Sequence, residues 1–161
     1  MKDKSLIWEI LRWICVACAL ALLIAQFGGN TISSADAATV AAAVTETMDM
    51  TNMQPADTRM VKRLYGLDPS VFEDCILYYP NTNMMAEEIL IVKLQEVSQQ
   101  ESVVNAIQAR LDTQKNTFEG YGVEQFDLLS NYSTIECRGN FVLFVVSKNH
   151  SAARSAFLDA L

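Results

Sequence analysis

Hydrophobic and polar residues follow two different periods along this chain, and the change of period separates predicted strands from predicted helices. Short runs rich in β-branched and aromatic residues are typical of strands, and four such runs occur, at residues 73–79, 88–94, 134–138 and 141–146. The last run is apolar without interruption, so we expect it to lie in the centre of a sheet or to be buried on both faces.

Helical spacing is clearest between residues 98 and 118. Ser98-Gln-Gln-Glu101 has the sequence of a capping box. Apolar residues then recur three and four positions apart on one stripe, at Val104, Ile107, Leu111 and Phe118. Shorter helices are predicted at residues 36–50, at 57–65, at 123–129 with Phe126 facing the core, and from Ser151 onward.

The resulting order is two helices, two strands, two helices, two strands and a final helix. Gly139-Asn140 is typical of a tight turn between the last two strands. Two hairpins separated by helices predict an α+β fold, in which an antiparallel four-stranded sheet has helices packed on one face. The helix at 36–50 either packs on this sheet or stands off from it. The expected boundaries place residues 30–56 in a helical stalk or connector and residues 57–161 in the α+β domain.

The amino-terminal segment differs from the rest of the chain. An uncharged apolar run at residues 13–27 follows three basic residues, Lys2, Lys4 and Arg12. Counted from Ile10, the run reaches the lower limit of about 17 residues for a helix that crosses a bilayer. We therefore predict a cytoplasmic stub and a transmembrane helix in residues 1–29. The positive-inside rule places the amino terminus in the cytoplasm and the following domain outside the membrane.

A cleaved signal peptide is the alternative interpretation of this segment. Ala35-Asp36-Ala37 has the small-x-small form of a cleavage site, some way beyond the apolar core. Cys15 and Cys18 lie within the apolar run and not after it, so neither has the position of a lipoprotein acylation site. An uncleaved anchor makes this a single-pass membrane protein, whereas cleavage near Ala37 makes it a soluble secreted protein.

The charge of the chain narrows the class of partner. The whole chain has a net charge of −7, and residues 36–161 carry nine basic against seventeen acidic residues, a net charge of −8. An acidic domain has no electrostatic attraction to phosphate backbones. We therefore expect no nucleic-acid partner.

No motif predicts a catalytic, cofactor-binding or metal-binding site. His150 is the single histidine and is expected at the exposed start of the last helix, and neither a Gly-x-Ser-x-Gly elbow nor a glycine-rich phosphate loop occurs. Two pairs of acids, Glu73-Asp74 and Glu87-Glu88, begin the first two strands. Because these strands are expected to be antiparallel, the pairs lie at opposite ends of the hairpin. We interpret them as solvated strand ends that discourage edge pairing.

Two cysteines and three tyrosines are the remaining candidates. Cys75 and Cys137 are either bridged, as an exported domain permits, or two separate buried thiols. Tyr78, Tyr79 and Tyr121 are candidates for a ligand or partner surface, because tyrosine combines a flat apolar face with a polar tip. Since neighbours in a strand point to opposite faces, one of the two adjacent tyrosines is expected to be in the core.

Four segments together carry a resemblance to a known family. They are Arg63-Leu-Tyr-Gly-Leu67, Glu87-Glu-Ile-Leu-Ile-Val-Lys93, Arg110-Leu-Asp-Thr-Gln-Lys-Asn-Thr-Phe-Glu-Gly-Tyr121 and Gly139-Asn-Phe-Val-Leu-Phe-Val-Val-Ser147. They resemble a bacterial domain-of-unknown-function family (DUF 4358), and the likeness covers roughly residues 40 to 158. The resemblance implies a small envelope protein, mainly of Gram-positive anaerobes, behind an anchor or a lipoprotein signal. It implies no activity.

These observations predict a membrane-anchored, extracytoplasmic, non-catalytic interaction module. Its expected partner is an envelope protein, a peptide or a wall component. The alternatives are an envelope enzyme that acts on a wall or peptide substrate through scattered carboxylates, and a cleaved, soluble, secreted binding protein. An interaction module should have an exposed apolar or aromatic patch or an unpaired strand edge. An enzyme should have a cleft with converging acids.

Overall fold

The computed structural model describes residues 12–16 and 31–161. Residues 12–16 are helical, and Ile32–Leu161 forms a compact unit of its own. None of the helices in these two ranges is long and apolar enough to cross a membrane. The predicted transmembrane segment lies mostly outside the described residues, at 1–11 and 17–30.

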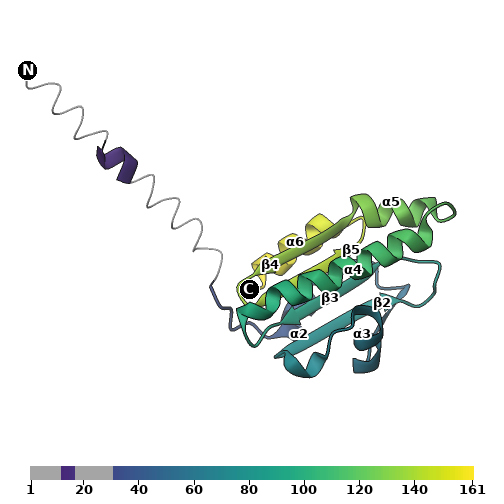
Figure 1. The fold of residues 1–161 in the computed structure, drawn as a ribbon, viewed down its shortest axis with the longest axis horizontal. Coiled ribbons are helices and arrows are strands. Elements are labelled where there is room, and N and C mark those ends of the chain that lie inside the picture. The colour runs from purple at the N-terminus through teal and green to yellow at the C-terminus, as the bar shows by residue number, and fades with distance from the viewer. Residues whose placement is uncertain (1–11, 17–30) are drawn as a thin grey trace, which may run out of the picture. The chain divides into compact units, whose positions relative to one another are not determined.

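The centre of the domain is an antiparallel five-stranded sheet (Figure 1). The strands are β1 (Met53–Pro55), β2 (Asp74–Pro80), β3 (Glu88–Lys93), β4 (Ser133–Arg138) and β5 (Phe141–Val146), in the order β1-β2-β3-β5-β4. Both predicted hairpins are confirmed, and β3 joins them by pairing with β5. The prediction of four strands is wrong. The fifth strand, β1, is a three-residue edge strand on β2 that ends in proline, a residue that sheets accept at an edge.

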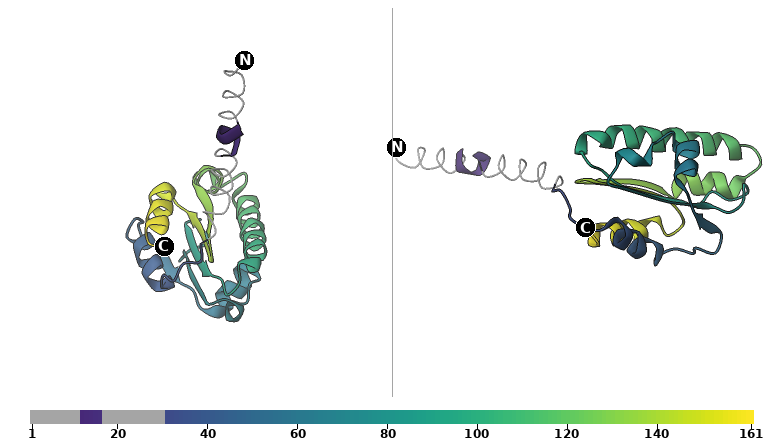
Figure 2. Two further views of the ribbon diagram at one scale, coloured as in Figure 1. Left: turned by 90° about the vertical axis from the view of Figure 1, so that its left-hand side faces the viewer. Right: turned by 90° about the horizontal axis from the view of Figure 1, so that it is seen from below.

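Five helices pack on the two faces of this sheet. They are α2 (Ala37–Thr45), α3 (Thr58–Tyr65), α4 (Gln100–Phe118), α5 (Val123–Asn131) and α6 (His150–Asp159). Helices α3, α4 and α5 cover one face, whereas α2 and α6 cover the other (Figure 2, right). The prediction that helices pack on one face is therefore wrong. Because every residue of β3 and β5 is buried, both faces of these strands require a cover.

Alternate residues of β3 and β5 contribute to two separate hydrophobic cores. Leu90, Val92, Val142 and Phe144 belong to the core beneath α3, α4 and α5, which we call the α4 core. Ile89, Ile91, Phe141, Leu143 and Val145 belong to the core beneath α2 and α6, which we call the α6 core. The alternation follows from the two-residue period of a strand.

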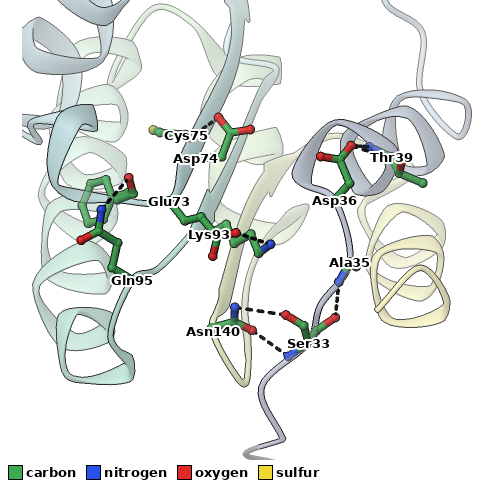
Figure 3. Close-up of polar contacts among 11 residues, drawn as sticks. Ser33, Ala35, Asp36, Thr39, Glu73, Asp74, Cys75, Lys93, Gln95 and Asn140 are labelled. Carbon is green, nitrogen blue, oxygen red and sulfur yellow. Dashed lines mark hydrogen bonds and ion pairs between the residues drawn. The ribbon is translucent and has the colours of Figure 1, made fainter.

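The segment before the sheet is part of the folded domain. Val40 and Val44 of α2 are completely buried in the α6 core. The expected stalk at residues 30–56 therefore packs on the sheet, and the compact unit begins at Ile32, far before the predicted boundary at residue 57. Ser33 fixes this segment, since its backbone N–H donates to Asn140 Oδ1 at 2.8 Å and its carbonyl accepts from Asn140 Nδ2 at 3.2 Å (Figure 3).

The ends of the helices confirm one pair of predicted caps and contradict another. Asp57 caps α3 by accepting from the Met60 N–H at 2.8 Å, and Gly66 ends that helix with a φ of 68°, as the sequence predicts. The capping box predicted at Ser98 is wrong. A 3₁₀ turn at Val97–Gln99 precedes α4, and Gln99 Oε1 instead accepts from the Glu96 N–H at 3.1 Å. In α5, Phe126 is exposed, whereas Leu128 and Leu129 are buried.

Candidate functional site

The most unusual residue of the domain is a buried glutamate at the beginning of β3. Glu88 has no exposed surface, although it precedes a completely apolar run of strand residues. It has the same strand parity as Leu90 and Val92, so its side chain faces the α4 core. The interpretation of Glu87-Glu88 as a solvated strand end is therefore wrong for Glu88.

Three side chains surround the Glu88 carboxylate with hydrogen-bond donors. Arg110 donates from Nε to Oε1 at 3.3 Å and from a terminal nitrogen to Oε2 at 2.9 Å. Gln114 donates from Nε2 to Oε2 at 3.0 Å, and the Tyr65 hydroxyl donates to Oε1. We call these four residues the Glu88 cluster. Arg110 and Gln114 reach one carboxylate because residues four apart lie on the same face of a helix.

Two members of the cluster, Tyr65 and Arg110, have shifted pKa values. Burial, reinforced by the negative charge of Glu88, raises the pKa of Tyr65 well above its usual range, so its phenol stays a neutral donor. For Arg110, burial lowers the pKa, but the hydrogen bonds and charge of Glu88 outweigh it, and the net shift is upward. A buried carboxylate held in this way is fully compensated. It is a fixed part of the fold with no surface to offer a substrate.

A small pocket lies beside the cluster. It has a volume of about 190 Å³ and is lined by Arg63, Leu64, Tyr79, Pro80, Thr82, Asn83, Met85, Arg110, Gln114, Thr117 and Phe118. The lining therefore comes from α3, from the end of β2 with its following loop, and from α4. Two members of the Glu88 cluster, Arg110 and Gln114, contribute to its wall.

The charge of this pocket contrasts with the charge of the domain. Its lining contains two arginines and no aspartate or glutamate, although residues 36–161 have a net charge of −8. Arg110 is compensated by Glu88 but uses only two of its five N–H donors on the carboxylate. Arg63 is exposed and makes no ion pair within residues 31–161. The pocket thus offers positive charge and polar donors to an anionic group.

A second hollow shares one wall with this pocket. Its volume is about 330 Å³, and Met84, Phe118, Tyr121, Gly122, Val123, Glu124 and Gln125 line it. Phe118 lines both hollows, which together we call the groove. Met84, Tyr121 and Val123 are each more than three-fifths exposed, so this end of the groove presents apolar side chains to solvent beside the polar Glu124 and Gln125.

Two local features hold the apolar end in shape. A side chain at Gly122 would place its Cβ 2.5 Å from the Phe118 ring, so only glycine fits there without displacing the phenyl group. Gln125 Oε1 accepts the Ala86 N–H at 3.0 Å and so connects α5 to the loop between β2 and β3. These two contacts give the apolar end of the groove a defined shape.

The structure separates the three candidate tyrosines. Tyr79 lines the pocket and Tyr121 lines the second hollow, so both lie in the groove. Tyr78 lies on the other face of β2 and packs against the α6 core. Tyr78 and Tyr79 thus point to opposite faces of β2, as expected for neighbours in a strand, and Tyr79 is the one at the candidate site. The Tyr121 ring lies 6.1 Å from the Phe118 ring, between centroids.

The two domain cysteines are free thiols. Cys75 pairs in register with Val92, Val92 with Val142, and Val142 with Cys137, so the cysteines are at the two ends of one row across four strands. Three strand spacings separate them by about 14 Å, whereas a disulfide requires Cα atoms within about 7 Å. The bridge hypothesis is therefore wrong for this fold, and the alternative of two separate thiols holds.

The remaining sequence candidates do not form a second site. Asp74 is in register with Lys93 at one end of the β2–β3 hairpin, whereas Glu88 begins β3 at the other end, as the antiparallel arrangement predicts. Glu73 is exposed and pairs with Lys93 at 2.6 Å. The part of the chain that the structure describes contains no group of acids, cysteines and histidine able to hold a metal ion. His150 begins α6 as expected, but it is half-buried and not exposed, with Nδ1 2.7 Å from Thr134 Oγ1.

Sequence reasoning did not find the Glu88 cluster, although signals for it exist. A charged residue inside a buried strand requires a partner, and Arg110 and Gln114 are polar residues spaced four apart on the buried stripe of α4. Three of the four segments that carry the family resemblance meet here. They supply Tyr65 and Arg63, then Glu88, and finally Arg110 and Gln114.

Comparison with known proteins gives a family and no function. Residues 46–147 match the family model described as "Domain of unknown function (DUF4358)", which includes β1 to β5 and helices α3, α4 and α5. The match confirms the resemblance found in the sequence. No curated protein and no solved structure matches the chain.

Proposed function

We propose that this chain, which belongs to the family of domains of unknown function DUF4358, is a membrane-anchored extracytoplasmic interaction module that binds its partner without catalysing a reaction. The observation that carries the proposal is the pocket beside the Glu88 cluster. It concentrates two arginines and no acid in the surface of an acidic domain. Such a charge contrast favours recognition of a group of opposite sign.

The state of Glu88 supports recognition over catalysis. A general acid or base must reach a substrate and exchange a proton with it. The Glu88 carboxylate, which is bound to two residues of the pocket wall, is completely buried and saturated by Tyr65, Arg110 and Gln114. Its role is to fix Arg110 and Gln114 in place, because preorganised donors lose little conformational freedom when they bind.

The location is proposed from the amino-terminal sequence. The apolar run at residues 13–27 follows Lys2, Lys4 and Arg12, a pattern that favours a single span with its amino terminus in the cytoplasm. A domain so placed faces envelope proteins, exported peptides and wall components. The exposed apolar end of the groove is the kind of surface that such a module requires.

Site-specific photo-crosslinking in the producing cell tests whether the groove is the binding surface. A photo-reactive residue is placed in the full chain at Thr117, which lines the pocket, or at Ala152, an exposed residue of α6 on the other face of the sheet. We expect a reproducible adduct from position 117 and none from position 152. Equal adducts from both positions, or none from position 117, would contradict the proposal.

A labelling experiment tests the location separately. Ala152→Cys introduces an exposed thiol, which a membrane-impermeant maleimide should modify in intact cells with the outer wall layers removed. The parent chain, with its partly buried Cys75 and Cys137, gives the background. Labelling of the variant only after the cells are lysed would show that the domain faces the cytoplasm.

A further inference from the structure

We infer that the groove takes the carboxy-terminal end of a peptide chain, with the terminal carboxylate at Arg63 in the pocket and the preceding residues across the apolar hollow. This inference rests on the proposed function, because it names the class of ligand for the same surface. The groove requires three features of its ligand: an anionic end, a hydrogen-bond donor next to that end, and apolar residues that follow it.

The anionic end follows from the donors around the pocket. Arg63 is exposed and unpaired within residues 31–161, and Arg110 has N–H donors left after its bonds to Glu88. Planar guanidinium groups match the geometry of a carboxylate. Thr82, Asn83 and Thr117 add neutral polar groups to the lining, and no acid there would repel an anion.

The need for a hydrogen-bond donor on the ligand, next to its anionic end, follows from Gln114. Its Nε2 donates to Glu88, so the orientation of the amide is fixed, since the reverse orientation would place two acceptors together. Its Oε1 is buried and has no partner, the one such atom among buried side-chain oxygens and nitrogens in the described ranges. Gln114 lines the pocket, so a small shift of this wall on binding would expose Oε1 to the N–H that the last peptide bond of a chain carries next to its carboxylate.

The apolar continuation follows from size and composition. A volume of about 190 Å³ is below the ~300–1,000 Å³ of pockets that enclose a whole small molecule, so the pocket suits one end of a longer ligand. Phe118 connects it to the second hollow, where Met84, Tyr121 and Val123 are exposed. An extended peptide with apolar residues near its end would cover these side chains, whereas a neutral glycan would leave the arginines unused.

A peptide array tests the inference with the purified full chain in mild detergent. The array holds hexapeptides in which the last three positions vary, each made once with a free carboxylate and once as the carboxy-terminal amide. We expect binding to free-carboxylate peptides with apolar residues in those positions, and at least about a tenfold weaker signal for the amides, as expected for loss of a charge-assisted contact.

Two matched arginine variants assign the contact. Arg63 and Arg59 are exposed residues of the same helix, α3, but only Arg63 lines the pocket. We expect Arg63→Gln to weaken binding of the selected peptide about tenfold and Arg59→Gln to change it less than about twofold. Equal losses in both variants would indicate general attraction to the domain and would overturn the assignment.

The outcomes separate the ligand class from the proposed function. Equal binding of acids and amides, or no peptide bound at all, overturns the inference of a terminal carboxylate. If position 117 still crosslinks to a partner in the cell, the interaction module stands and the ligand is of another class. Loss of both results would overturn the proposed function as well.

Discussion

Glu88 and Glu136 are two strand glutamates that each pair with a helix arginine, and their different surroundings predict different costs of breaking the pair. Arg110 holds the completely buried Glu88, whereas Arg154 holds Glu136 at 2.6 Å with nearly half of its own side chain exposed. We expect Arg110→Met to lower the free energy of unfolding by about 3–5 kcal/mol, because it leaves a buried charge uncompensated. Arg154→Met should cost about 0–1 kcal/mol.

Chemical denaturation followed by circular dichroism measures both costs on the same scale. Because the two variants make the same change at a helix–strand ion pair, Arg154→Met is the control for replacing a helix arginine by methionine where the partner glutamate is less buried. Similar costs for the two variants would mean that Glu88 finds other compensation, and the description of the cluster as a fixed unit would be wrong.

Tyr65 predicts a pH effect at the alkaline end. Burial and the charge of Glu88 raise the pKa of Tyr65 well above the usual value of about 10. A folded-state pKa above the unfolded value means that its contribution to stability is complete below about pH 10 and is lost as the pH rises further. Absorbance at 295 nm should therefore show equal phenolate amplitudes for the parent chain and Tyr65→Phe until the parent unfolds. A difference of one tyrosine before unfolding would contradict this.

The residues of the candidate site were only partly predictable. Tyr79 and Tyr121 were named as candidates because a tyrosine next to a turn is a local signal in the sequence, and the structure places both in the groove. The burial of Glu88 depends on Arg110, which lies 22 positions away and arrives through the packing of α4 on β3. Sequence periodicity places each residue on a face, but it does not state which faces meet.

At the scale of elements, the segment before α2 predicts what processing at Ala35-Asp36-Ala37 would do. Ser33 bonds to Asn140, and Asp36 caps α2 by accepting from the Thr39 N–H at 3.1 Å (Figure 3). Ala37 is buried. A chain that begins after Ala37 loses the cap, worth about 1 kcal/mol, and the two Ser33–Asn140 hydrogen bonds, each worth about as much. We expect its free energy of unfolding to fall by about 2–3 kcal/mol.

A chain that begins at Thr31 is the matched control, since it keeps Ser33 and Asp36. Thermal unfolding of the two chains under one buffer condition makes the comparison. Equal midpoints would show that residues 31–37 contribute nothing to the domain, and a soluble form processed at this site would then be as stable as the anchored one.

Strands were easier to predict than the way helices cover them. The four longer strands and their two hairpins follow from short apolar runs and turn residues. The three-residue strand β1 contains too few residues to show a period and depends on the register with Pro80 and Tyr78. The uninterrupted apolar run of β5 indicated that helices must cover both faces of the sheet. The helix predicted at 36–50 was the one that could cover the second face.

At the scale of the whole sheet, the row from Cys75 to Cys137 predicts the chemistry of both thiols. Burial raises the pKa of Cys75 to about 12 and also raises the pKa of Cys137. Because the thiolate is the reactive form, iodoacetamide at pH 8 should modify both slowly in the folded protein and rapidly in denaturant. Mass spectrometry without reductant should find both alkylated after unfolding. A Cys75–Cys137 peptide in that sample would refute the register.

Adjacent residues of β5 test whether the two cores form one cooperative molecule. Leu143 lies in the α6 core and Phe144 in the α4 core, and both are completely buried. We expect Leu143→Ala to cost about 2–5 kcal/mol and Phe144→Ala about 3–5 kcal/mol. Since the residues share one strand, each variant should shift a single unfolding transition seen by circular dichroism and by tyrosine fluorescence.

Two separate transitions would show that α2 and α6 unfold independently of the face that carries the groove. A single transition instead couples occupancy of the groove to the stability of the whole domain, so a bound peptide would raise the unfolding midpoint of both variants.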